Sequence, residues 1–308
     1  MGCGSYSAKD WAKLKNSRGL DSSANANQTF NNDVIQDKYN AFYVDKRESF
    51  DSEDSPESTP IIIGFDVTGS MGYLANEIAT NSLNETIMQI LEKKPVTNPH
   101  MMCAAFTGPH APLQVTQFEA DIRVVEQLLD FKLDGWNQYA YDNILWYFAA
   151  NHTKIDSFEK RGKKGILIGI GDEKCGENEN ILTPENINSL FGDKIEKNIE
   201  FKTALKNARE KYDVVHIVVG DSCRFDKGRR DSYSGWQKAM PGCVAKLLDE
   251  NIKYLADVIV AIIEILGGKE KSDVINNLPE EKKAVVENAL EDFGIVHNLK
   301  DKIKRIFK

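Results

Sequence analysis

The most informative stretch of the chain reads Ile61-Ile62-Ile63-Gly64-Phe65-Asp66-Val67-Thr68-Gly69-Ser70-Met71-Gly72. Its uninterrupted apolar start is typical of a parallel strand that is buried on both faces. The strand ends at Asp66, and the hydroxyl residues Thr68 and Ser70 follow at alternate positions. A hard cation such as Mg²⁺ takes oxygen ligands and keeps several waters. One carboxylate and two hydroxyls on a single loop therefore predict part of a Mg²⁺ or Mn²⁺ site.

Strand-like runs alternate with helical patterns along much of the chain. Apolar runs predict strands over residues 61–66, 100–106, 113–118, 165–171, 214–219 and 244–248. Helical spacing predicts helices over 73–93, 121–131, 142–152 and 251–266, and at least two more within 182–212. This alternation predicts an α/β fold with a doubly wound, mostly parallel central sheet flanked by helices, as in Rossmann-like proteins.

The ends of the chain differ in composition from this region. We expect an irregular N-terminal arm with an acidic linker over 1–59, a main domain over 60–267, and a C-terminal helical extension over 268–308. The Ser- and acid-rich segment 49–60, which contains Pro56 and Pro60, is typical of a linker. Its acidic residues make an intramolecular plug over the metal crevice one alternative. In the extension, 298–307 has one apolar face, which favours docking on the chain's own domain, with contact to a partner or a membrane surface as the alternative.

A second strand also delivers an aspartate at its end, in Ile168-Gly169-Ile170-Gly171-Asp172-Glu173. In open α/β sheets, ligands bind in the crevice outside the carboxyl ends of the strands. Asp66 and Asp172 are therefore expected at the same edge of the sheet. A simpler interpretation is that Asp66 and Thr68 only cap the following helix. Capping accounts for one of these residues but not for the whole set.

The motif Asp66-x-Thr68-Gly69-Ser70-Met71 resembles the DxSxS signature of von Willebrand factor A (VWA) domains, with threonine at the middle position. The resemblance covers about residues 59–267 and is closest to bacterial and phage VWA proteins. It implies a doubly wound α/β fold with a metal-ion-dependent adhesion site at the carboxyl edge of the sheet. In that family the open metal position accepts a carboxylate from a partner protein.

The resemblance also implies further metal ligands. It assigns Asp172 to the family's aspartate after a later strand, often acting through water, with Glu173 as its neighbour. Many VWA domains place a threonine before the third helix, but the loop 134–142 has none. Asn137 is the best oxygen donor there, through its side-chain carbonyl, and Gln138 is its rival. The expected ligand set is therefore Asp66, Thr68, Ser70, Asn137 and Asp172.

Composition excludes several other classes of protein. The net charge of −8 argues against a DNA-binding protein, since phosphate neutralisation needs clustered basic residues. The five cysteines form no CxxC pair, and the five histidines have no zinc spacing, so we expect a reducing, cytoplasmic location without a zinc site. No apolar h-region follows residues 1–6, and the longest apolar run, Tyr254 to Leu266, is too short to span a membrane.

The expected function is a metal-dependent protein–protein interaction module that binds a partner's Asp or Glu, and not an enzyme. One alternative is a haloacid-dehalogenase-like phosphotransferase with Asp66 as nucleophile and Lys163 or Lys164 as the lysine. Thr68 and Gly176 stand where that chemistry expects aspartates. An RNA-associated, Ro-like role and an adaptor role for an AAA+ ATPase are further alternatives. The basic cluster Arg224, Lys227, Arg229 and Arg230 is either a solvated loop or a rim for an acidic partner.

Overall fold

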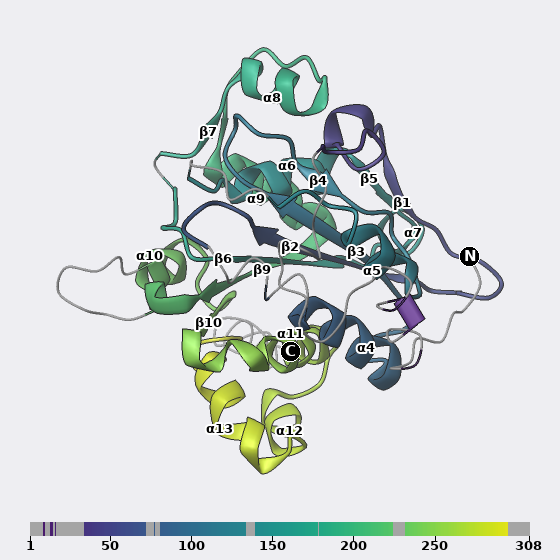
Figure 1. The fold of residues 1–308 in the computed structure, drawn as a ribbon, viewed down its shortest axis with the longest axis vertical. Helices are drawn as coiled ribbons and strands as arrows, with labels where there is room; N and C mark the ends of the chain where they lie inside the picture. Colours follow the sequence, from purple (N-terminus) through teal and green to yellow (C-terminus); the bar gives the residue numbers. More distant parts are fainter. Residues whose placement is uncertain are drawn as a thin grey trace, which may run out of the picture.

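A six-stranded sheet forms the centre of the computed structural model (Figure 1). The structure describes residues 34–71, 81–133, 139–177, 179–223 and 232–294, and also Lys9, Lys13, Leu14, Asn16 and Glu77. The strand order is β4-β3-β2-β6-β9-β10, and all neighbours are parallel except the edge strand β4. The strands are β2 (Thr59–Asp66), β3 (Pro99–Phe106), β4 (Gln114–Val115), β6 (Gly165–Gly171), β9 (Tyr212–Val219) and β10 (Val244–Leu247). The predicted doubly wound, mostly parallel sheet is thus confirmed.

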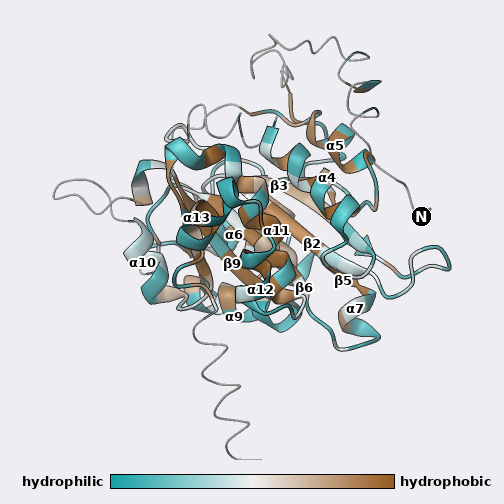
Figure 2. Cartoon of the chain, turned by 90° about the horizontal axis from the view of Figure 1, so that it is seen from below, coloured by the Kyte–Doolittle hydropathy of each residue, from teal (hydrophilic) through white to brown (hydrophobic). Residues whose placement is uncertain are grey.

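Helices cover both faces of this sheet, as Figure 1 shows. One face packs against α4 (Leu83–Lys93), α5 (Arg123–Leu128), α11 (Leu255–Leu266), α12 (Lys271–Asn276) and α13 (Glu280–Ala289). The other packs against α6 (Asp142–Asn151), α8 (Pro184–Phe191), α9 (Phe201–Lys211) and α10 (Ser232–Ala239). In Figure 2 the central strands and α11 are mostly hydrophobic, while the outer helices also carry hydrophilic faces. Each strand can therefore be apolar throughout, because both of its faces are covered.

Short elements complete the fold. A two-stranded parallel pair joins β1 (Arg47–Ser49) to β5 (Thr153–Ile155), and an antiparallel pair joins β7 (Ile181–Leu182) to β8 (Ile199–Glu200). The remaining helical turns are η1 (Ala41–Tyr43), α7 (Asp156–Glu159), η3 (Gly220–Cys223) and η4 (Asp249–Tyr254). Apart from η4, these short elements were not predicted, and neither was α10, since a few residues carry too little periodicity.

Two predicted elements differ in length from those observed. The strand predicted over 113–118 is a strand only at Gln114–Val115, which pairs with β3 and has a further isolated bridge to Asn40. The helix predicted over 251–266 begins as the 3₁₀ turn η4 and is α-helical only in α11. Most of residues 72–80, in the predicted helix 73–93, lies outside the described part, so α4 tests only its second half.

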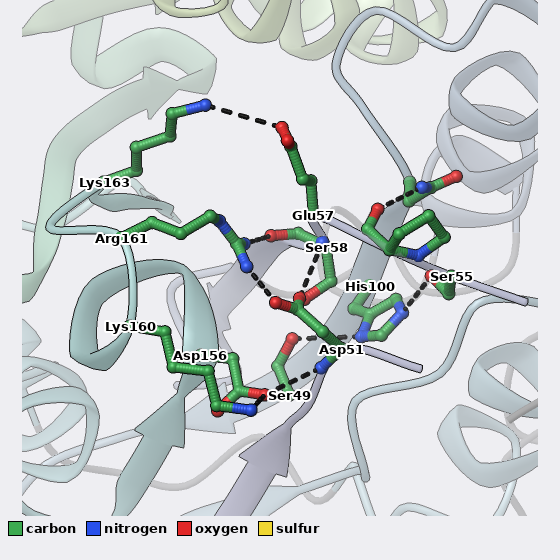
Figure 3. Close-up of polar contacts among 12 residues, drawn as sticks. Ser49, Asp51, Ser55, Glu57, Ser58, His100, Asp156, Lys160, Arg161 and Lys163 are labelled. Atoms are coloured by element: carbon green, nitrogen blue, oxygen red, sulfur yellow. Dashed lines mark hydrogen bonds and ion pairs between the residues drawn. The ribbon is translucent and has the colours of Figure 1, made fainter. Parts of the chain in front are cut away.

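The segment 49–60, predicted to be an acidic linker, instead forms hydrogen bonds at the amino edge of the sheet, the side where the parallel strands begin (Figure 3). The Asp51 carboxylate accepts hydrogen bonds from the backbone and hydroxyl of Ser58, at 2.9 and 2.7 Å, and from Arg161. His100 on β3 lies between the hydroxyls of Ser49 and Ser55, at 3.0 and 2.8 Å. Because Ser58 immediately precedes β2, residues 51–58 lie at the opposite end of that strand from Asp66. They do not plug the crevice.

The C-terminal residues that follow Gly267 pack onto the main core. Pro279 precedes α13, and Val286 and Leu290 join the same hydrophobic cluster as α11. The amphipathic segment 298–307 lies outside the described residues. Within the described part of the chain, the helices are all too short or too polar to span a bilayer.

Candidate metal centre

The first loop of the site begins where β2 ends. Asp66 is fully buried, and its Oδ1 accepts a 2.7 Å hydrogen bond from the backbone N–H of Thr68. This bond closes the loop back onto the strand end, as aspartates commonly do in turns. Thr68 is also buried, but Ser70 is exposed. The loop thus runs from a buried carboxylate to a hydroxyl that solvent or a partner can reach.

The second part of the site comes from β6, which lies beside β2. The Ser70 hydroxyl donates toward Asp172 Oδ1 at 2.9 Å and lies 3.3 Å from Glu173 Oε1. Thr68 Oγ1 lies 3.1 Å from the same Ser70 oxygen. A hydroxyl has only one proton to donate, and ionised carboxylates have none. The cluster therefore contains more oxygen acceptors than its own protons can satisfy.

Asp66 shows the same excess of acceptors most clearly. Its Oδ2 is buried and has no hydrogen-bond partner among the residues that the structure describes. Burial raises the pKa of Asp66 well above its ordinary value. Hydrogen bonds from Thr68 oppose this rise, while the negative charges of Asp172 and Asp142 add to it. A bound cation would compensate all three carboxylates, since an opposite charge favours the ionised form.

The donor set suits a hard divalent cation. Every candidate atom is an oxygen, from Asp66, Thr68, Ser70 or Asp172. Carboxylate and hydroxyl oxygens suit Mg²⁺ and Mn²⁺, whereas zinc sites favour histidine and cysteine. Among the described residues, no group of three or more His, Cys, Asp or Glu side chains could hold a metal by itself. The hydroxyls of Thr68 and Ser70 are therefore needed to complete any site here.

Four of the five predicted ligands come together in the structure. Asp66, Thr68, Ser70 and Asp172 form one cluster, and Glu173 joins it through Ser70. Asn137 and its rival Gln138 lie in 134–138, outside the described residues, so that part of the ligand set stays a prediction. The basic cluster between 224 and 230 also lies outside them.

The structure also brings in residues that the sequence did not single out. Asp142 begins α6, is 4% exposed, and accepts a 3.0 Å hydrogen bond from Nδ1 of His216 on β9. Because His216 lies in an apolar run, the sequence predicts a satisfied core or edge histidine. Its Nδ1 is bonded, but its buried Nε2 has no partner among the described residues. The sequence signal for Asp142 is its position at the start of the predicted helix 142–152.

Two alternative chemistries fit the geometry poorly. Lys163 and Lys164 precede the first residue of β6, whereas Asp66 ends the parallel strand β2. Seven residues of strand at about 3.3 Å each separate these two ends of the sheet. Neither lysine can therefore serve Asp66 as a phosphotransferase lysine would. The second alternative is nucleophilic catalysis by Cys175, which follows Lys174 in the sequence. Burial raises the pKa of Cys175 to about 12, so its thiol is not activated.

Comparisons with known proteins give only distant matches, all of them among solved structures. No protein-family model matches the chain, and no curated protein does. Among solved structures, von Willebrand factor type A from Catenulispora acidiphila is 13% identical over 69% of this chain and 43% of its own, with a TM-score of 0.41. The open pilus adhesin SpaC from Lactobacillus rhamnosus GG is 10% identical over 71% of this chain and 31% of its own, with a TM-score of 0.45.

A third solved structure is proximal thread matrix protein 1 from the mussel byssus, described with a zinc-occupied MIDAS motif. It is 13% identical over 68% of this chain and 45% of its own, with a TM-score of 0.39. The chain thus matches less than half the length of each of these three proteins. Because these identities and TM-scores are so low, the fold is assigned from the chain's own strand order and loop positions. On those grounds the chain has the doubly wound, mostly parallel α/β fold that its sequence motif implies.

Proposed function

We propose that this protein is a metal-dependent protein-interaction module, in which a Mg²⁺- or Mn²⁺-loaded site at the carboxyl edge of the sheet binds a carboxylate of a partner protein. The observation that carries the proposal is the buried Asp66 Oδ2, which lacks a hydrogen-bond partner among the described residues beside a cluster of further oxygens. A buried polar atom without a partner calls for an explanation, and a bound ion is one of the standard ones.

Each side chain has a distinct part in this proposal. Asp66 would supply the buried charge, oriented by the Thr68 N–H, and the hydroxyls of Thr68 and Ser70 would supply neutral oxygens. Asp172 would act from the opposite loop, and Asn137 is proposed as the donor from the third. When bound, the divalent cation supplies an electrophilic position for an outside carboxylate. Because Ser70 is exposed, this proposed position would face solvent, within reach of a partner.

The burial of Asp66 favours this role over catalysis. A nucleophilic carboxylate must reach a substrate phosphorus atom, but Asp66 has no exposed surface. A metal ligand can be buried, because only the ion's open coordination position has to face the partner. The site is therefore proposed as non-enzymatic.

Titration with Mn²⁺, in which the heat of binding is measured by calorimetry, tests the metal site. We expect wild-type protein to bind one ion, and Asp66→Ala to lose the binding while staying folded. Asp213→Ala, at the amino end of β9, is a matched control that should bind as the wild type does. If wild type and Asp66→Ala give the same heats, the proposal is wrong.

A second measurement tests the carboxylate part. A partner should be retained on immobilised protein in Mg²⁺ and released by a chelator. Replacing its contacting Asp or Glu by the amide should remove the binding, because the desolvated charge pair is then lost. Retention that is indifferent to the chelator would count against a metal-mediated contact.

A further inference from the structure

Helix α10 contacts the backbone of the loop that carries Asp172. The hydroxyl of Ser232 donates to the carbonyl oxygen of Asp172 at 3.0 Å. The indole N–H of Trp236 donates to the carbonyl oxygen of Glu173, also at 3.0 Å. Residues four apart lie on one face of a helix, so one turn of α10 holds two successive carbonyls. Both side chains are buried, at 0% and 1% exposure.

The indole of Trp236 also connects this loop to the start of α6. Its ring stacks on the imidazole of His216, with centroids 3.8 Å apart and planes 12° apart. His216 in turn donates to Asp142, the first residue of α6. The stacked pair of Trp236 and His216 therefore contacts both the loop that carries Asp172 and the start of α6.

The sheet leaves room for this arrangement at a glycine. Gly169 on β6 is paired with His216 on β9. A Cβ atom at Gly169 would lie 2.9 Å from Asp142 Oδ1 and 3.2 Å from His216 Nδ1. Distances that short would displace one of the two groups. The pair of Asp142 and His216 thus depends on the absence of a side chain at this position.

The loop that carries Asp172 and Glu173 needs such support for an electrostatic reason. Both acidic residues lie by the Ser70 hydroxyl, and Asp172 also adds its negative charge to the environment of Asp66. Like charges repel, and buried ones do so more strongly. Backbone hydrogen bonds oppose that repulsion without using the carboxylate oxygens themselves, which stay available as ligands.

We propose that Ser232 and Trp236 are positioning residues of the metal centre, which hold the loop of Asp172 and Glu173 in place through its backbone. The inference rests on the proposed metal-dependent function. Residues that orient the ligands of a metal typically change its affinity by 10- to 100-fold when they are replaced. Because Trp236 bonds to this loop, its fluorescence also reports on the loop directly.

Three single variants test the proposal in the full-length protein. Ser232→Ala removes the first hydrogen bond, and Trp236→Phe removes the second while it keeps an aromatic ring near His216. Trp146→Phe is the matched control: Trp146 is equally buried and packs 6.3 Å from Trp236, but its Nε1 has no hydrogen-bond partner among the described residues. Each variant is titrated with Mn²⁺ by calorimetry and by tryptophan fluorescence, and its melting temperature is measured in chelator.

We expect Ser232→Ala and Trp236→Phe each to weaken Mn²⁺ binding by about tenfold or more, and Trp146→Phe to leave it unchanged. The change of fluorescence on Mn²⁺ addition should be as large in Trp146→Phe as in the wild type and smaller in Trp236→Phe, where Trp136, next to Asn137, remains as a second reporter. In chelator, Ser232→Ala should lower the melting temperature by no more than Trp146→Phe does. A purely structural role for Ser232 would instead give a larger loss in the absence of metal.

Two results would overturn the inference in distinguishable ways. If wild type binds Mn²⁺ and Ser232→Ala binds it equally well, the positioning role is wrong and the proposed function survives. If wild type itself binds no Mn²⁺, the proposed function is wrong, and the positioning role goes with it. Ser232→Ala decides the first question even if Trp236→Phe fails to fold, because it removes only one oxygen.

Discussion

Asp51 at the amino edge of the central sheet is partly exposed, Asp66 at the carboxyl edge is fully buried, and the two carboxylates have opposite surroundings. At the amino edge, both oxygens of Asp51 accept hydrogen bonds, from Ser58 and Arg161. At the carboxyl edge, Asp66 Oδ2 has no partner among the described residues, and its neighbours include two more aspartates. Burial alone would raise the pKa of Asp51, but the Ser58 and Arg161 contacts outweigh it and lower that pKa. A carboxylate that serves the fold is neutralised by protein groups, whereas the one at the candidate site is left for an external cation.

The largest expected effect is a difference between Asp66 and Asp51 variants in how much Mg²⁺ raises the free energy of unfolding. At a Mg²⁺ concentration about a hundred times its dissociation constant, the free energy of unfolding should rise by about 2.7 kcal/mol. Asp66→Asn should abolish this increment. In chelator, Asp66→Asn should cost no stability, because it removes a buried charge that protein groups leave uncompensated. Chemical denaturation with and without Mg²⁺ measures both quantities.

Asp51→Asn provides the control for that comparison. It should lower the free energy of unfolding by about 1–3 kcal/mol with or without Mg²⁺, since it weakens the contacts of the Arg161 guanidinium. The Mg²⁺ increment itself should be retained. Loss of the increment in Asp51→Asn rather than in Asp66→Asn would reverse the assignment of the two edges.

The two ends of β6 offer a smaller test with glycines. A Cβ at Gly165, at the amino end, would lie 2.8 Å from the Pro60 carbonyl and from the Tyr212 ring. Gly165→Ala should therefore destabilise the protein by about 1–3 kcal/mol through overpacking, without changing Mn²⁺ affinity. At the carboxyl end, a Cβ at Gly171 would lie 3.2 Å from the Asp66 Cβ. Gly171→Ala should mainly weaken Mn²⁺ binding, and equal affinity in both variants would contradict the comparison.

The pH dependence of stability should come partly from His100 at the amino edge. Burial lowers the pKa of His100 below its ordinary value of 6.5. The unfolded chain then binds a proton more readily than the folded protein does. The stability that neutral His100 contributes is therefore fully present above pH 6.5 and is lost as the pH falls from 6.5 through the lowered pKa of the folded protein. The wild-type melting temperature should fall between about pH 7.5 and 5.5. His100→Gln should show a flatter profile, and a slope identical to wild type would exclude His100 as its source.

The smallest effect is expected for an exposed ion pair at the same edge. Lys163 and Glu57 lie 3.6 Å apart, and both side chains are more than 60% exposed. Glu57→Gln should change the free energy of unfolding by less than about 1 kcal/mol, because solvent screens such pairs. A larger loss would show that the amino edge depends on its surface charges as well as on its buried contacts.

Periodicity alone predicted the sheet and most of its helices. The continuous apolar runs of β2, β6 and β9 could only be strands with both faces covered. The short strand β1 and the helix α10 carry no comparable pattern, so they were missed. The segment 49–60 has the composition of a linker, but composition does not show that Arg161, 110 residues away from Asp51, bonds to it.

Part of the site could also be read from the chain. Asp66, Thr68, Ser70 and Asp172 stand at strand ends, and parallel strands bring those ends to one edge by geometry alone. The sequence by itself therefore determined the doubly wound sheet and this group of oxygens. Only the tertiary structure decided that Asp66 lacks a partner for one oxygen, that Asp142 pairs with His216 above Gly169, and that α10 holds the Asp172 loop. These contacts join residues 60 to 74 positions apart or depend on burial, and no local pattern in a chain encodes either property.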